Sequence, residues 1–366
     1  MAIGADSSRP GVVDLKDPAA WRSALASPRP VLAHLNGDTT WLLQLPIPNS
    51  VVASPGSKSK SKKSARRSRF NILIDPWLQG PQSDVASWFS TQWHVVEPAV
   101  QTIQELEEVL AELGDGKAGA GTTQIDCVAI SHEFTDHCHQ ATLTELPRGV
   151  PIVATEKAAD LIRSWAHFDT VITTPGFSSS TTDWRDVLVD QTGTLPPWLG
   201  VGRVITQGNA LYYHSALIIA FDLGYSPNQR ATRSKDTAPQ KQSEAVIYSP
   251  HGIKGSDLEC VRAAGINTLA LLHGLDDIRI WMTAQLNLGA LNGIQAVRAS
   301  GAKYWVATHD EAKKGGGFIS WLLQRTTYSL RDAVEAEKAK AQDEEGDESP
   351  DYEFVELGSG DGLILT

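Results

Sequence analysis

Residues 125 to 139 read Ile-Asp-Cys-Val-Ala-Ile-Ser-His-Glu-Phe-Thr-Asp-His-Cys-His, an apolar run followed directly by histidines and a carboxylate. The apolar run over 125–130 predicts a buried β-strand. We expect the polar residues behind it to form a loop at the exit of that strand. Imidazole nitrogens beside a carboxylate oxygen are ligands that a borderline-soft divalent cation such as zinc prefers. The stretch therefore predicts a metal site at the end of a sheet strand.

Two further histidines follow expected strands in the same way, far along the chain. His251 lies in a Tyr-Ser-Pro-His-Gly stretch after the apolar run 245–248, and His309 follows the run 303–308. Three separate strand-to-loop sites predict one metal centre assembled at the rim of a sheet.

The order of these motifs resembles the metallo-β-lactamase superfamily, particularly its divergent branch of intracellular metal-dependent hydrolases, over residues 30 to 325. The ligand loop of that superfamily reads His-x-His-x-Asp-His. His132, Asp136 and His137 match this pattern, and Phe134 stands at the second histidine position.

The resemblance also implies roles for residues outside this loop. His309 matches the late ligand histidine, and His251 stands where the superfamily has an Asp that bridges two metals. Asp75, at the end of an expected strand, matches an Asp that orients a ligand histidine from behind. His214 is the one candidate for the remaining ligand histidine.

We predict one principal ion, because neutral imidazole at position 251 cannot bridge two metals as a carboxylate does. Zinc is the expected metal, with iron or manganese as alternatives. The expected ligands are Asp136, His137, His251, His309 and, as an added ligand, His132. Asp136 or His132 is expected to take the proton from metal-activated water.

Five residues are expected to support the ligands or line the pocket: Asp75, Phe134, His139, His214 and His273. Several candidates also have a purely structural interpretation. Asp136 could cap the helix expected after it, His139 could lie on the surface of that helix, and His251 and His273 could be turn residues.

Alternating strands and helices behind a strand-rich N-terminal part indicate an α/β chain with two mixed sheets flanked by helices. The resemblance makes this a four-layer αββα sandwich of the metallo-β-lactamase type. Asn36-Gly37-Asp38 between two apolar runs predicts a hairpin. Helices are expected over 105–113, 283–299 and 318–340.

The predicted domain organisation is simple. An N-terminal extension over 1–28 precedes one catalytic domain over 29–340, and an acidic tail with an edge strand occupies 341–366. The basic stretch 55–69 is almost without apolar residues, so we expect a disordered insert within the domain.

Composition excludes several classes. A net charge of −11 in 366 residues is unlike the basic footprint of a nucleic-acid binder. No apolar stretch is long enough to span a membrane, and the N-terminus lacks the pattern of a secretory signal. Three cysteines without paired spacing favour a reducing compartment, which predicts a cytoplasmic protein. The oligomeric state is left open.

Together these features predict a metal-dependent hydrolase that uses metal-activated water on a small ester, lactone, amide, thioester or phosphodiester. The alternative is a degenerate superfamily member that acts as a non-catalytic scaffold or small-molecule binding protein. Phe134 and the missing middle histidine favour that alternative.

Overall fold

The fold is given by a computed structural model, which describes residues 11–52, 67–84, 86–114, 123–181, 183–206, 213–226, 243–280, 284–340 and 351–366. Most of the predicted basic insert at 55–69 and the first ten residues of the predicted acidic tail lie outside these ranges.

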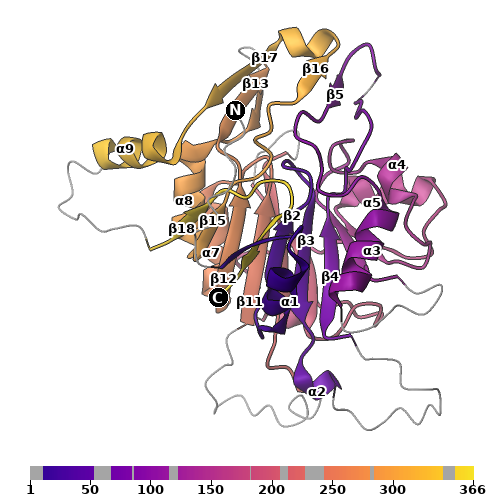
Figure 1. The fold of residues 1–366 in the computed structure, drawn as a ribbon. Coiled ribbons are helices and arrows are strands. Elements are labelled where there is room, and N and C mark those ends of the chain that lie inside the picture. Colours follow the sequence, from indigo (N-terminus) through magenta and orange to yellow (C-terminus); the bar gives the residue numbers. More distant parts are fainter. Residues whose placement is uncertain are drawn as a thin grey trace.

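Two mixed sheets form the centre of the molecule (Figure 1). The first has eight strands, in the order β1 (Val12–Asp14), β19 (Asp361–Ile364), β2 (Val31–His34), β3 (Trp41–Pro46), β4 (Arg69–Ile74), β6 (Cys127–Ile130), β7 (Ile152–Ala154) and β8 (Val171–Thr173). The second has six, in the order β18 (Glu353–Val355), β15 (Tyr304–Val306), β12 (Ile266–His273), β11 (Ser243–Ser249), β10 (Ser215–Phe221) and β9 (Leu199–Ile205).

Helices cover the outer face of each sheet. The first sheet is covered by α1 (Pro18–Ala26), α3 (Ile103–Leu113), α4 (Gln140–Leu143) and α5 (Glu156–Ser164). The second is covered by α6 (Trp184–Leu188), α7 (Gly255–Ala263) and α8 (Ala290–Ser300), and α9 (Leu330–Lys340) packs against α8. The short α2 (Asn49–Val52) follows β3.

Strand β6 shows how the sequence specifies this layering. Cys127 and Ala129 point to the core between the two sheets, whereas Val128 and Ile130 point to the core beneath the helices. Because successive side chains point to opposite faces, a strand covered on both faces must be apolar at every position. The predicted four-layer αββα sandwich is confirmed.

Two small sheets stand at one end of the sandwich, at the top of Figure 1. One joins β13 (Asp276–Ile280), β14 (Ala284–Asn287) and β17 (Leu323–Thr327), and the other joins β5 (Thr91–Trp93) and β16 (Lys314–Gly316). A short 3₁₀ helix, η2 (Phe318–Trp321), follows β16.

The small sheets correct two expected helices. The helix expected over 283–299 begins only at Ala290, because residues 284–287 pair with β13 instead. The helix expected over 318–340 is divided into η2, β17 and α9, because β17 also pairs with β13.

The C-terminal segment contributes a strand to each large sheet. β18 is an edge strand of the second sheet, whereas β19 lies between β1 and β2 inside the first. Within the described part of the chain, no helix has the length and apolarity needed to cross a bilayer.

Candidate metal centre

The carboxyl ends of parallel strands bring the candidate residues to one rim. β4 and β6 are parallel neighbours in the first sheet, and β11, β12 and β15 are parallel neighbours in the second. Loops behind such strands meet at the same edge of a sheet, the usual place for ligand sites in parallel sheets.

His137 is held by Asp75. Asp75 follows β4 and accepts hydrogen bonds from the backbone N–H of Ser131 (2.7 Å) and, through its other oxygen, from His137 Nδ1 (2.7 Å). Because Nδ1 carries the proton, the lone pair of His137 is on Nε2, which is buried and has no hydrogen-bond partner among the described residues. Burial lowers the pKa of His137, but the Asp136 and Asp75 carboxylates outweigh it and raise that pKa.

His251, behind β11 of the second sheet, is held in the same manner by a residue of a small sheet. Its Nδ1 lies 2.7 Å from Oδ1 of Asn287, at the end of β14, and its Nε2 is likewise buried and without a hydrogen-bond partner in the described residues. Burial and the neighbouring His137 lower the pKa of His251 well below its usual value. His251 is therefore a neutral imidazole with a lone pair directed into the protein.

His309 completes the set. Its Nδ1 lies 3.2 Å from Oδ1 of Asp38, its backbone N–H donates to the Asp38 carbonyl (2.9 Å), and its Nε2 lies 3.8 Å from Oδ2 of Asp136. His309 and Asp75 have positive φ angles, +60° and +43°. Such conformations cost about 1–3 kcal/mol each and concentrate at functional sites.

These residues form two overlapping triads: His132, His137 and His251, and Asp136, His137 and His309. In each triad the three ligand atoms lie within 4.8 Å of one another, and all the residues are buried. The four expected ligands are thus divided between the triads: Asp136 and His309 belong to one, His251 belongs to the other, and His137 belongs to both. That all four bind a single ion stays a prediction.

His132 is more constrained than its companions. Its Nδ1 lies 2.9 Å from Ser131 Oγ and its Nε2 lies 3.0 Å from the Tyr213 carbonyl oxygen. The ring of Phe134 stacks near it, with ring centroids 5.9 Å apart, and also contacts the Tyr213 ring at 4.8 Å. An apolar ring thus lies beside His132.

Three of the candidate histidines lie outside both triads. His139 caps α4, with Nδ1 2.9 Å from Thr142 Oγ1. His214 supports the backbone of His251, with Nδ1 3.1 Å from its carbonyl oxygen. Both ring nitrogens of His273 are engaged, by the Gly274 carbonyl at 2.8 Å and by Asn292 Oδ1 at 2.9 Å.

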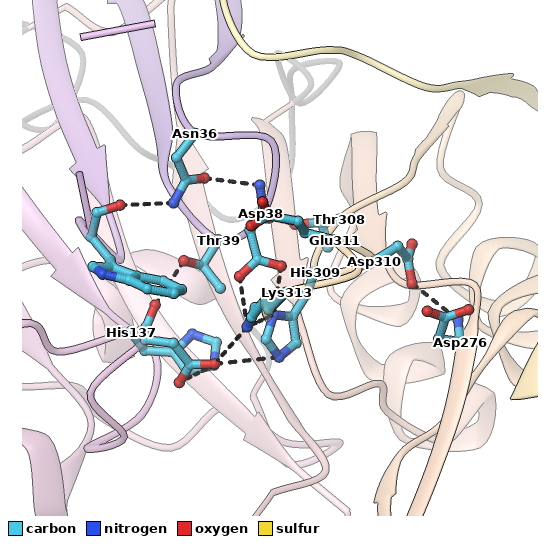
Figure 2. Close-up of polar contacts among 12 residues, drawn as sticks. Asn36, Asp38, Thr39, His137, Asp276, Thr308, His309, Asp310, Glu311 and Lys313 are labelled. Atoms are coloured by element: carbon cyan, nitrogen blue, oxygen red, sulfur yellow. Dashed lines mark hydrogen bonds and ion pairs between the residues drawn. The ribbon is translucent and has the colours of Figure 1, made fainter. Parts of the chain in front are cut away.

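Sequence reasoning missed Asp38, Asn287 and Lys313. The Lys313 Nζ lies 2.7 Å from Oδ2 of Asp38, 2.9 Å from Oδ2 of Asp136 and 3.5 Å from His309 Nδ1 (Figure 2). Its side chain is only 10% exposed. The turn-forming Asn-Gly-Asp stretch was a usable signal for Asp38, but nothing in the Lys-Lys-Gly-Gly-Gly surroundings marks Lys313.

The electrostatics of this group are dominated by Lys313. Burial raises the pKa of Asp136, but Lys313 and the histidines outweigh it and hold that pKa well below its usual range. Burial lowers the pKa of Lys313, but the Asp136 and Asp38 carboxylates outweigh it and raise that pKa well above its usual range. Both groups are therefore charged near neutrality.

The donor set fits a divalent metal ion. Three imidazoles each direct Nδ1 to a side-chain oxygen, an arrangement that fixes the tautomer and ring orientation of metal-binding histidines. Two of the opposite nitrogens are buried without hydrogen bonds, which is costly unless another group binds there. Nitrogen ligands with one carboxylate suit zinc and its neighbours in the first transition row.

Comparisons with known proteins give structural neighbours only. No protein-family model matches the chain, and no curated protein matches it.

The chain is similar to an isothiocyanate hydrolase from Delia radicum gut bacteria, with 13% identity, a TM-score of 0.48 and coverage of 92% of this chain and 99% of that one. It is similar to Igni18, a metallo hydrolase from Ignicoccus hospitalis (10% identity, TM-score 0.49, coverage 92% and 98%). A third similar structure is the metallo-β-lactamase fold protein YhfI from Bacillus subtilis, with 11% identity, a TM-score of 0.44 and coverage of 91% of this chain and 99% of that one. Similarity at this level says nothing about the reaction.

Proposed function

We propose that this protein is a metal-dependent hydrolase acting on a small ester, lactone, amide, thioester or phosphodiester. The observation that carries the proposal is the common arrangement of His137, His251 and His309. Each imidazole is fixed through Nδ1 by a side-chain oxygen, and the three ring centroids lie 4.9–5.0 Å from one another. Three histidines with no role beyond packing would not need this shared orientation.

The chemistry follows from the donor set. A divalent ion held there supplies Lewis acidity, which lowers the pKa of a bound water to about 7 and polarises a carbonyl or phosphoryl oxygen. Zinc is the proposed metal, with iron and manganese as alternatives. Asp75, Asn287 and Asp38 keep the three imidazoles in the tautomer that ligation requires.

Asp136 has the best placement to act beside the ion. Its Oδ2 is engaged by Lys313, while its Oδ1 lies 3.6 Å from His137 Nε2. We assign to this ionised oxygen the roles of ligand and hydrogen-bond acceptor for the reacting water. His132 could take part only by giving up its contact with Ser131 or Tyr213.

A second candidate is a small-molecule binding or scaffold protein without catalysis. It is favoured by the ion pairs of Lys313, which already satisfy part of the charge of Asp38 and Asp136, and by the Phe134 ring beside His132.

The two candidates differ in metal content and turnover. We expect protein purified without chelator to contain about one divalent ion per chain, as a centre with three nitrogen ligands and a carboxylate implies. The ion is expected to be lost in the double variant Asp136→Ala, His137→Ala. A hydrolysis screen over esters, lactones, amides, thioesters and phosphodiesters should give turnover in the wild type only.

The matched control is the double variant Asp160→Ala, His167→Ala, which removes the same residue types outside the centre. It should keep both the metal and the activity. Metal-free wild-type protein without turnover in metal-supplemented assays would favour the binding or scaffold role.

A further inference from the structure

Lys313 places a buried ammonium group directly beside the proposed metal centre. It contacts Asp38 at 2.7 Å and Asp136 at 2.9 Å, and its Nζ lies 5.4 Å from the centroid of the Trp77 ring. Two carboxylates and an aromatic face are favourable surroundings for a cation. Because the side chain is 10% exposed, water screens these contacts poorly.

The backbone around Lys313 is anchored on both sides. Glu311 accepts hydrogen bonds from the backbone N–H groups of Val95 (2.6 Å) and Val96 (2.7 Å). On the other side, Lys314 starts β16 and pairs with Trp93 of β5. The ammonium is therefore presented from a fixed segment.

The charges of the centre can be counted over the described residues. Three carboxylates touch the candidate ligand histidines or Lys313: Asp38, Asp75 and Asp136. Among these contacting groups alone, with the imidazoles neutral as ligation requires, one ammonium leaves two negative charges, which one divalent ion neutralises. A second divalent ion would add two uncompensated positive charges to a buried site, at a high desolvation cost.

The location of the ammonium agrees with this count. Lys313 contacts Asp136 and lies near His309, two members of the same triad. The two triads share His137, whose single free nitrogen can bind only one ion. The ammonium of Lys313 thus disfavours a second ion beside Asp136 and His309, although these two ligands alone would attract one.

We propose that Lys313 is a fixed internal cation that pairs with Asp38 and Asp136 in place of a second metal ion and so limits the centre to one divalent ion. This inference rests on the proposed metal centre. It makes Lys313 a positioning and charge-balancing residue, because the ammonium acts through Asp136 and Asp38.

The test is the number of Zn²⁺ ions bound per chain, measured by equilibrium dialysis with elemental analysis and by calorimetric titration. Wild-type protein should saturate at one ion. Lys313→Met keeps the length and apolar character of the side chain without the charge. It leaves three negative charges, one more than a single ion neutralises, and frees the Asp38 and Asp136 oxygens beside His309, so it should saturate at two ions. Its first ion should also bind at least tenfold more tightly.

Two further variants separate charge from structure. Lys313→Arg keeps the charge and should bind one ion. Lys314→Met removes the neighbouring, exposed lysine and should leave both stoichiometry and affinity unchanged. A purely structural role for Lys313 would lower the thermal midpoint of Lys313→Met without changing the number of ions.

The outcomes distinguish the two proposals. If Lys313→Met binds one ion with the same affinity as the wild type, the proposed role of Lys313 is wrong and the proposed metal-dependent hydrolase is unaffected. Two ions in the wild type would also overturn it, even if Lys313→Met did not fold. No ion in either protein would overturn the metal centre and this inference together.

Discussion

At the scale of single residues, the side chains that contact the histidines determine which ring nitrogen is protonated and which is free to bind a metal. A neutral imidazole has one donor and one acceptor nitrogen, and the partner of one nitrogen determines the state of the other. Asp75, Asn287 and Asp38 each take the Nδ1 side, so the three lone pairs face inward. These three oxygens come from different loops and strands, yet each one orients a histidine by binding its Nδ1.

Substitution of Asp75 tests most directly whether metal binding depends on the side chain that orients a histidine. It accepts hydrogen bonds from the Ser131 N–H, the Ser131 hydroxyl and His137 Nδ1. In Asp75→Asn an amide NH₂ replaces one acceptor oxygen, so one donor must lose its partner. We expect metal affinity to fall about 10- to 100-fold, the usual effect of removing such a partner.

The measurement is competition for Zn²⁺ against a chelator of known affinity. Asp169→Asn, at an exposed ion pair with Arg148, is the control and should bind like the wild type. Unchanged affinity in Asp75→Asn would show that His137 does not depend on this carboxylate.

At the scale of elements, strand exits and tight turns set the direction of each ligand. The turn between β11 and α7 is an example. Gly252, directly after His251, has a φ of +81°, and a Cβ built there would lie 2.6 Å from Leu288 Cβ and 2.8 Å from the Leu288 carbonyl oxygen. Only glycine meets both the left-handed backbone and the close approach at this position.

The variant Gly252→Ala should therefore lose stability and metal affinity together. Backbone strain and overpacking each cost about 1–3 kcal/mol, and relieving them must displace the His251 turn from Leu288. Thermal unfolding of the metal-free protein measures the first effect and Zn²⁺ titration the second.

Gly149→Ala is the matched control, because a Cβ there meets no atom within 4 Å and the backbone is not left-handed. It should leave both quantities close to the wild type. A normal Zn²⁺ affinity in Gly252→Ala would mean that the turn does not orient His251.

At the scale of the whole molecule, two sheets packed face to face place ligands from both halves of the chain at one rim. His137 comes from the first sheet, and His251 and His309 come from the second. Their ring centroids are nevertheless only about 5 Å apart, at 4.9 Å for His137 and His251 and 5.0 Å for His137 and His309. An ion at this point would link the two sheets.

Removal of the metal should accordingly destabilise the whole fold. An ion that binds only the folded state at a hundredfold excess over its dissociation constant stabilises by about 2.7 kcal/mol. For a chain of this size we expect chelator to lower the thermal midpoint by roughly 3–4 °C. Calorimetry with and without chelator measures the shift, and added Zn²⁺ should reverse it.

The double variant Asp136→Ala, His137→Ala should show no response to chelator or to Zn²⁺. A midpoint in the wild type that is the same with and without chelator would contradict an ion linking the two sheets.

Local pattern was enough to predict several parts of this protein. The apolar run of β6 and the loop behind it predicted the surroundings of Asp136 and His137, because a strand buried on both faces and a polar strand exit are both visible in neighbouring residues. The Asn-Gly-Asp hairpin was predictable for the same reason, and β2 and β3 pair around it. The layered α/β architecture followed from the alternation of such segments.

Tertiary structure alone decided the rest. β17 lies within a segment that reads as helix, and it is a strand only because β13 offers it backbone hydrogen bonds. Asp38 and Lys313 are 275 positions apart in sequence, and their ion pair exists only because the two sheets pack face to face and bring both loops to one rim. Charge balance in a buried site depends on which groups are within a few ångströms of one another, and periodicity along the chain carries no information about that.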